Sequence, residues 1–135
     1  MRSVLVIDDE LDVRDAIKRV LERAGYEVRT VESAEAAMAA LEARPATVII
    51  TDIIMPKING VEAIHGIRAK HPQVRIIAIS GGGNFGINAY QPNAITTTAY
   101  LAAADKAGAD LTLTKPFETQ ELLAALARVT GTGTA

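Results

Sequence analysis

The sequence predicts an α/β fold in which five β-strand–α-helix units, (βα)5, form a doubly wound parallel sheet of strand order 2-1-3-4-5. Short apolar runs rich in β-branched residues alternate five times with segments that have helical apolar spacing, which is the pattern of parallel strands joined by helices. The first, third and fourth runs are almost continuously apolar, as in strands covered on both faces. The second and fifth runs alternate with period two, so we expect them at the sheet edges.

The individual elements follow from these periodicities and from the residues that end each segment. The expected strands cover residues 4–7, 26–31, 47–51, 75–80 and 111–114. The expected helices cover residues 11–24, 34–44, 61–69, 96–107 and 118–129. Gly25 and Gly108 are the expected stops of the first and fourth helices, and Ser33 is the expected N-cap of the second.

Length and composition exclude several classes of protein. The chain has 135 residues, which suits one domain. It contains no cysteine, so disulfide frameworks and thiolate metal sites are excluded. A net charge of −2, no tryptophan and no long basic run argue against binding to nucleic acid or to an anionic membrane. No signal peptide or apolar stretch of membrane-spanning length is evident, so we expect a cytoplasmic protein.

We expect a single domain over residues 1–129, a flexible tail over 130–135 and no output domain. The connection between the fourth and fifth strands is roughly a dozen residues longer than the others, and its excess falls at about 81–94, where glycines and a proline oppose a regular helix. The pattern Gly81-x-Gly83-x-x-Gly86 in this loop matches a dinucleotide fingerprint. It follows the fourth strand instead of opening the fold, so we do not expect nucleotide binding.

Polar residues that carry chemistry follow four of the five strands. Asp8 and Asp9 follow the first strand, and Asp52 follows the third. Ser80 and Lys115 follow the fourth and fifth. The carboxyl ends of parallel strands share one edge of the sheet, so these side chains should converge. Three adjacent carboxylates repel one another, so either protons or a cation must compensate, and a hard divalent cation such as Mg²⁺, or Mn²⁺ in its place, fits oxygen ligands. With a lysine and a hydroxyl nearby, the set suits phosphoryl transfer to a carboxylate.

The motifs around these residues resemble those of the receiver domain of bacterial two-component response regulators, a flavodoxin-like fold. They are Val4 to Asp9, Asp52-Ile53-Ile54-Met55-Pro56 with Gly60, Ile79-Ser80-Gly81, and Lys115-Pro116-Phe117. The likeness covers residues 2–129 apart from the 81–94 loop and is closest in character to stand-alone, chemotaxis-regulator-like receivers. It implies a phosphorylated signalling switch that at most catalyses its own phosphorylation and dephosphorylation.

The resemblance also implies a role for each matching residue. Asp52 would accept a phosphoryl group from a histidine kinase or a histidine phosphotransfer protein. The implied metal ligands are Asp8 (through water), Asp9, Asp52 and the backbone carbonyl of Ile54. Ser80 would be the switch hydroxyl, and Lys115 would contact the phosphate. The implied structural positions are Pro56, Gly60 and Pro116, the last in a cis peptide bond with Lys115.

One departure and two alternatives remain open. Thr112 stands where receivers usually carry an aromatic residue that moves with the switch hydroxyl, so the switching position is degenerate. A downstream protein is expected to contact residues 96–126, with the 81–94 loop as a second candidate surface, and the chain is expected to be a monomer or weak homodimer. The alternatives are a scaffold that binds its partner regardless of phosphorylation, and a Mg²⁺-dependent aspartyl phosphatase. The latter is disfavoured because Ile54 stands where such enzymes carry a second aspartate.

Overall fold

The fold is a five-stranded parallel sheet of order β2-β1-β3-β4-β5, as the sequence predicts. The computed structural model describes residues 3–52, 60–80, 108–114 and 118–130. The strands are β1 (Ser3–Ile7), β2 (Glu27–Val31), β3 (Val48–Asp52), β4 (Arg75–Ser80) and β5 (Leu111–Thr114). The helices are α1 (Leu11–Arg23), α2 (Ala34–Ala43), α3 (Gly60–Lys70) and α5 (Thr119–Thr130).

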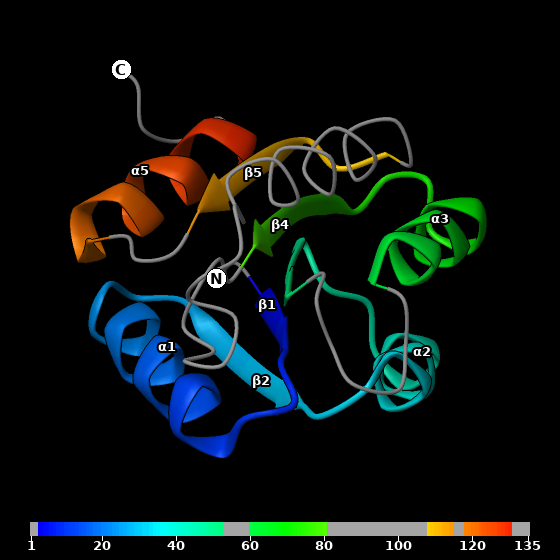
Figure 1. Cartoon of the computed structure of the whole chain (residues 1–135), viewed down its shortest axis with the longest axis horizontal. Helices are drawn as coiled ribbons and strands as arrows, with labels where there is room; N and C mark the ends of the chain where they lie inside the picture. Colours follow the sequence, from blue (N-terminus) through cyan, green and yellow to red (C-terminus); the bar gives the residue numbers. More distant parts are fainter. Residues whose placement is uncertain (1–2, 53–59, 81–107, 115–117, 131–135) are drawn as a thin grey trace, which may run out of the picture.

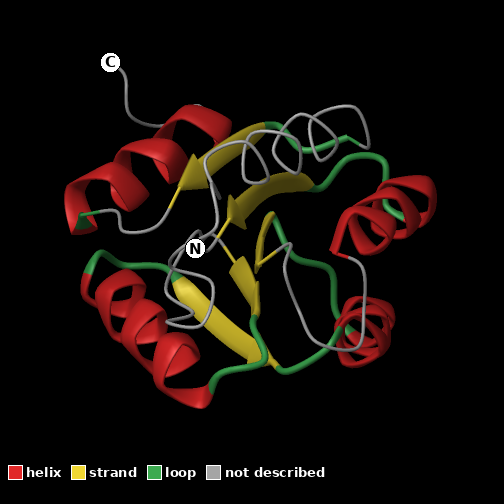
Figure 2. Ribbon diagram, viewed as in Figure 1, coloured by secondary structure: helices red, strands yellow, loops and turns green. Residues whose placement is uncertain are grey.

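The described helices form two layers around the sheet. Helices α1 and α5 cover one face, and α2 and α3 cover the other (Figures 1 and 2). Successive residues of β1 point to opposite faces: Val4 and Val6 pack in the core on the α1 and α5 side, whereas Leu5 and Ile7 pack in the core on the α2 and α3 side. A strand buried on both faces must be apolar throughout, which explains the continuous apolar runs.

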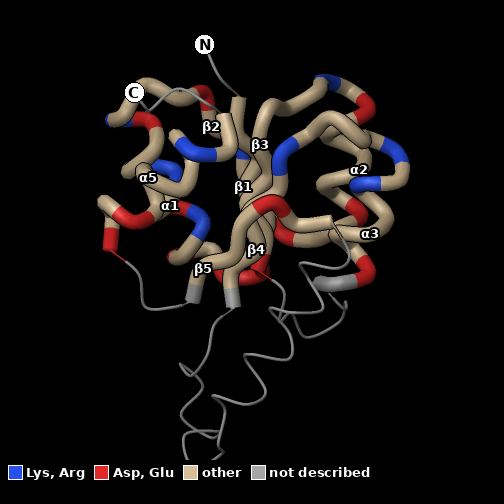
Figure 3. Tube along the Cα trace, turned by 90° about the horizontal axis from the view of Figure 1, so that it is seen from above, with Lys and Arg blue, Asp and Glu red and all other residues tan. Residues whose placement is uncertain are grey.

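The edge strands differ from the central ones as expected. All residues of β1 and β3 are buried, whereas four of the five residues of β2 are only partly buried. Figure 3 shows that the charged residues lie mostly on the helices and loops that flank the central strands. The alternating sequence of β2 therefore reflects its position at the edge of the sheet.

Helix ends follow from local chemistry. Gly25, which follows the C-cap residue Ala24 of α1, has a φ of +99°, and Gly108, which precedes β5, has a φ of +125°. Glycine adopts this conformation without steric cost. The Oγ of Ser33 accepts a hydrogen bond from the Ala36 amide at 3.1 Å and so caps α2. Helix α5 runs to Thr130, one residue further than expected, and the Thr130 hydroxyl donates to the Leu126 carbonyl at 2.8 Å.

Three of the expected segments lie outside the described residues: the loop at 81–94, the helix at 96–107 and the tail beyond Thr130. Among the described residues, no helix combines the length and apolar character needed to cross a membrane.

At the amino ends of β4 and β5, one arginine connects several backbone segments. The guanidinium of Arg68, on α3, donates to the carbonyls of Pro72, Val74 and Gly108. It also donates to Asp110 Oδ2 at 2.8 Å. The same carboxylate oxygen accepts from the amide of Ile76 at 2.8 Å. Arg68 therefore ties the loop before β4 to the start of β5.

We predict that Arg68→Lys lowers the free energy of unfolding by about 1–3 kcal/mol. The planar guanidinium bonds several carbonyls and a carboxylate at once, and the compact ammonium of lysine cannot make all of these contacts together. Urea unfolding measures the change. Arg19→Lys, at an exposed position on α1, is the control and should alter stability by less than about 0.5 kcal/mol. Equal effects of the two substitutions would contradict the role assigned to Arg68.

A second ion pair links the edge strand β2 to the end of α2. Arg44 Nη2 donates to Oε1 of Glu27 at 2.6 Å. This hydrogen bond lowers the pKa of Glu27 from its ordinary value of 4.5. A lowered pKa in the folded state means that the pair stabilises the fold above the unfolded-state pKa. That contribution is lost as the pH falls through the folded-state pKa.

The stability difference between the wild type and Glu27→Gln should therefore be present at pH 7 and shrink as the pH falls below about 4.5. Urea unfolding of both proteins over a pH series checks this. A difference that stays constant down to pH 3 would rule out the Arg44 pair as its source.

Candidate functional site: an acidic cluster at the carboxyl edge of the sheet

The register between β1 and β3 brings two aspartates side by side. Ile7 pairs with Thr51 across the two strands. Asp8 follows Ile7, and Asp52 follows Thr51 as the last residue of β3. The chain order reverses between these two neighbouring strands, which is where an open α/β sheet leaves a crevice.

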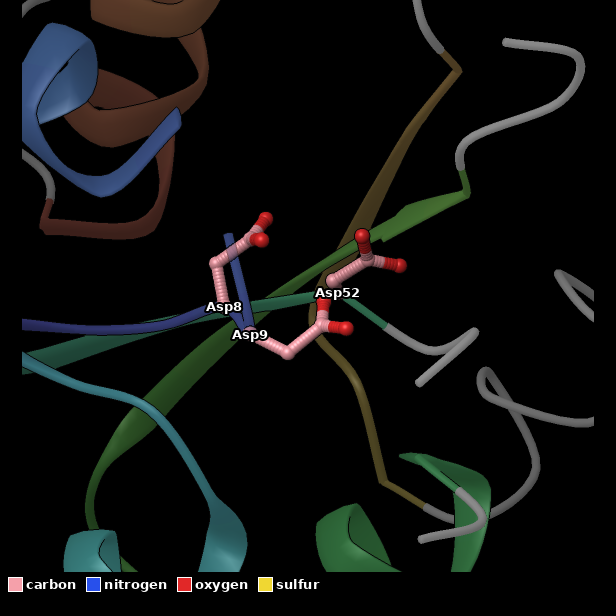
Figure 4. A group of neighbouring side chains, drawn as sticks. All are labelled: Asp8, Asp9 and Asp52. Carbon is pink, nitrogen blue, oxygen red and sulfur yellow. The ribbon is translucent and has the colours of Figure 1, made fainter. Parts of the chain in front are cut away.

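The carboxylates of Asp8, Asp9 and Asp52 form one cluster (Figure 4). One oxygen from each lies within 4.8 Å of the others. Asp8 and Asp52 are only 2% and 6% exposed, whereas Asp9 is exposed. Three negative charges at this separation repel strongly when two are shielded from water, so the cluster attracts cations. The structure thus brings together the three aspartates that the sequence singled out.

The backbone around Asp8 is held by several hydrogen bonds. Its amide donates to the Val31 carbonyl at 3.1 Å. Its Oδ1 accepts from the Glu10 amide at 2.9 Å, and its carbonyl accepts from Arg14 Nη1 at 2.7 Å. These contacts fix the turn that carries both Asp8 and Asp9.

The cluster fits a hard divalent cation. Its donors are carboxylate oxygens, the ligand type that Mg²⁺ and Mn²⁺ prefer over nitrogen or sulfur. Ligands on opposite sides of one Mg²⁺, each at about 2.1 Å, are roughly 4.2 Å apart. A 4.8 Å cluster therefore needs only small side-chain movements to surround one ion.

The structure describes the backbone of some, but not all, of the other expected site residues. Ser80 ends β4, one residue after Ile79, which pairs with Asp52, and it pairs with Thr114 of β5. The backbone of Ser80 thus lies at the same edge as the aspartates. Gly60 begins α3. The remaining expected positions lie outside the described residues: Ile54, Pro56, Lys115 and Pro116.

The sequence resemblance assigns Thr112 to the degenerate switch position. It lies in β5, is half-buried and pairs with Ala78 of β4. A small hydroxyl side chain is therefore built into the strand where an aromatic ring is usual.

Sequence reasoning missed Arg14. Its guanidinium reaches back from α1 to the turn that carries two of the aspartates. The only signal in the sequence is its place on the first turns of the helix that follows them.

Comparisons with known proteins agree with this geometry. The family model described as the response regulator receiver domain matches residues 4–127. The nitrogen assimilation regulatory protein NtrX of Azorhizobium caulinodans is 33% identical over 123 residues, 90% of this chain and 24% of that protein. The response regulator receiver protein CpdR of Brucella abortus is 30% identical over 88 residues, 65% of this chain and 73% of that protein.

Solved structures give the same result. The receiver domain of NtrX from Brucella abortus matches with a TM-score of 0.79 at 30% identity, over 96% of this chain and 99% of that one. The chemotaxis protein CheY4 of Vibrio cholerae matches with a TM-score of 0.77 at 28% identity, over 96% and 98% of the two chains.

The curated relatives NtrX, DctD and NtrC are longer proteins, and the chain spans about a quarter of their length. The match nevertheless covers nearly all of this chain, and the acidic cluster lies where the receiver motifs place it. The chain belongs to the response regulator receiver domain family.

Proposed function

We propose that this chain is a phosphorylation-dependent signalling switch in which Asp52 accepts a phosphoryl group from a phosphohistidine of a histidine kinase or a histidine phosphotransfer protein. The observation that carries the proposal is the cluster of Asp8, Asp9 and Asp52 at the carboxyl edge of the sheet. Receiver domains are generally signalling switches, not enzymes, and they interact with histidine kinases.

In the proposed step, a carboxylate oxygen of Asp52 forms a bond to phosphorus as the phosphorus–nitrogen bond of the donor imidazole breaks. The electron pair of that bond returns to the imidazole nitrogen. Asp52 is 6% exposed, so few water molecules compete with the donor at its carboxylate. Asp8 and Asp9, with Asp52 and the Ile54 carbonyl, would hold Mg²⁺ or Mn²⁺. The ion, when bound, neutralises charge that develops on the phosphoryl oxygens.

Two further residues complete the proposal. The Ser80 hydroxyl would donate a hydrogen bond to one phosphoryl oxygen, and the Lys115 ammonium would pair with another. The register supports their proximity, because Ser80 pairs with Thr114 and Lys115 is the next residue in the chain. Pro56, Gly60 and Pro116 would shape the backbone at this edge. The downstream partner would contact residues 96–126.

We predict that Asp52→Asn abolishes phosphorylation by a small phosphodonor such as acetyl phosphate in the presence of Mg²⁺, because an amide is not a competent nucleophile. Intact-mass spectrometry of the treated protein detects the added phosphoryl group. The matched control is Asp15→Asn, at an exposed position on α1, which should be phosphorylated as fully as the wild type. Full phosphorylation of Asp52→Asn would assign the acceptor to another residue.

Thr112 is half-buried in β5. How far a conformational change would spread from a phosphorylated Asp52 depends in part on this position. Without an aromatic ring at this strand position, residue 112 cannot supply the aromatic side-chain movement that usually accompanies the switch hydroxyl. A scaffold that binds its partner in both states is therefore the alternative function. A switch requires that phosphorylation shift the population between two conformations that a partner distinguishes.

We expect beryllofluoride with Mg²⁺, which mimics the phosphoryl group, to shift backbone amide resonances in β5 and α5 as well as next to Asp52. Heteronuclear NMR spectra with and without the mimic measure this, and Asp52→Asn treated in the same way is the control. Shifts confined to the neighbours of Asp52 would favour the scaffold.

A further inference from the structure

We infer that Arg14 is a positioning residue of the metal site, whose guanidinium holds the β1–α1 turn so that the carboxylates of Asp8 and Asp9 are arranged before a cation binds. The inference rests on the proposed function, since it assigns a role within the same site. Arg14 is half-buried, and its Nη1 lies 2.7 Å from the Asp8 carbonyl oxygen.

The bonded carbonyl is well placed to orient two side chains at once. It belongs to the peptide unit that joins Asp8 to Asp9, and that unit is planar. A hydrogen bond to its oxygen therefore restrains the plane from which both residues extend. Because Arg14 bonds the backbone, its contact with the turn uses none of the carboxylate oxygens that would bind a cation.

The N-cap residue of α1 does not itself stabilise the turn through its side chain. Glu10 is the N-cap residue of α1, and its side chain makes no capping hydrogen bond. The Glu10 amide is instead bonded by Asp8 Oδ1 at 2.9 Å, an atom of the cluster itself. A cation that binds the Asp8 carboxylate competes with the hydrogen bond from the Glu10 amide. The hydrogen bond from Arg14 to the Asp8 carbonyl does not involve the carboxylate, so the cation does not compete with it.

Arg14 also carries a positive charge, and its electrostatic effect has the opposite sign to its positioning effect. On charge alone, removal of a nearby guanidinium would strengthen binding of a divalent cation. Loss of preorganisation would weaken cation binding, because metal affinity falls when contacts that orient the metal ligands are removed. The direction of the change in affinity therefore distinguishes the two roles.

The experiment is a Mg²⁺ titration of the metal-free chain, followed by amide NMR, on the wild type, Arg14→Met, Arg14→Lys and Arg19→Met. Arg19→Met removes the same charge from an exposed position on the same helix. We expect Arg14→Met to raise the Kd on the order of tenfold and Arg19→Met to leave it near the wild-type value. Arg14→Lys should recover most of the affinity, because an ammonium can still donate to a carbonyl. If Arg14→Met does not fold, Arg14→Leu replaces it, because leucine also favours a helix and has no hydrogen-bond donor.

A second measurement needs no metal. Hydrogen exchange of the Glu10 amide should be faster in Arg14→Met than in Arg19→Met, because the turn is less ordered. Unchanged exchange, equal or tighter Mg²⁺ binding by Arg14→Met, or equal weakening by Arg19→Met would each overturn the inference while leaving the proposed function intact. A wild-type chain that binds no Mg²⁺ at all would overturn both.

Discussion

The site depends on the parallel register between β1 and β3. Ile7 pairs with Thr51, and this single alignment sets Asp8 beside Asp52. A slip of one residue would turn every side chain of a strand to the other face of the sheet. The core opposes the slip, because Val4 and Val6 on one face would have to exchange places with the larger Leu5 and Ile7 on the other. Apolar packing on both faces thus determines the separation of the carboxylates.

Much of the fold was predictable because it follows from repeated local patterns. Apolar runs identified the strands. The continuous apolar run of β1 and the alternating residues of β2 identified the centre and the edge of the sheet, in agreement with the burial of the two strands. Several element ends differ from the expected ones by one residue, as at Thr130 of α5 and at the start of β2. The acidic cluster was predictable for a topological reason, since the carboxyl ends of parallel strands meet at one edge.

The contacts of long side chains were not predictable. Arg14 and Arg68 are arginines on amphipathic helices, where such residues usually extend into solvent. Here each turns toward backbone carbonyls, and Arg68 reaches Gly108, 40 residues further along the chain. No periodicity encodes such a contact, because it depends on where loops from different units meet. The placement of the Ser80 and Lys115 side chains at the site stays a prediction for the same reason.

The contacts of Arg68 and the acidic cluster lie at opposite ends of the strands. The hydrogen bonds of Arg68 join segments at the amino ends of β4 and β5, whereas the aspartates lie at the carboxyl ends of β1 and β3. Rearrangement around the aspartates therefore need not break the contacts that join α3, β4 and β5. If the proposed switch operates, the carboxyl ends of β1 and β3 would exchange between two conformations while the contacts of Arg68 at the amino ends of β4 and β5 stay in place.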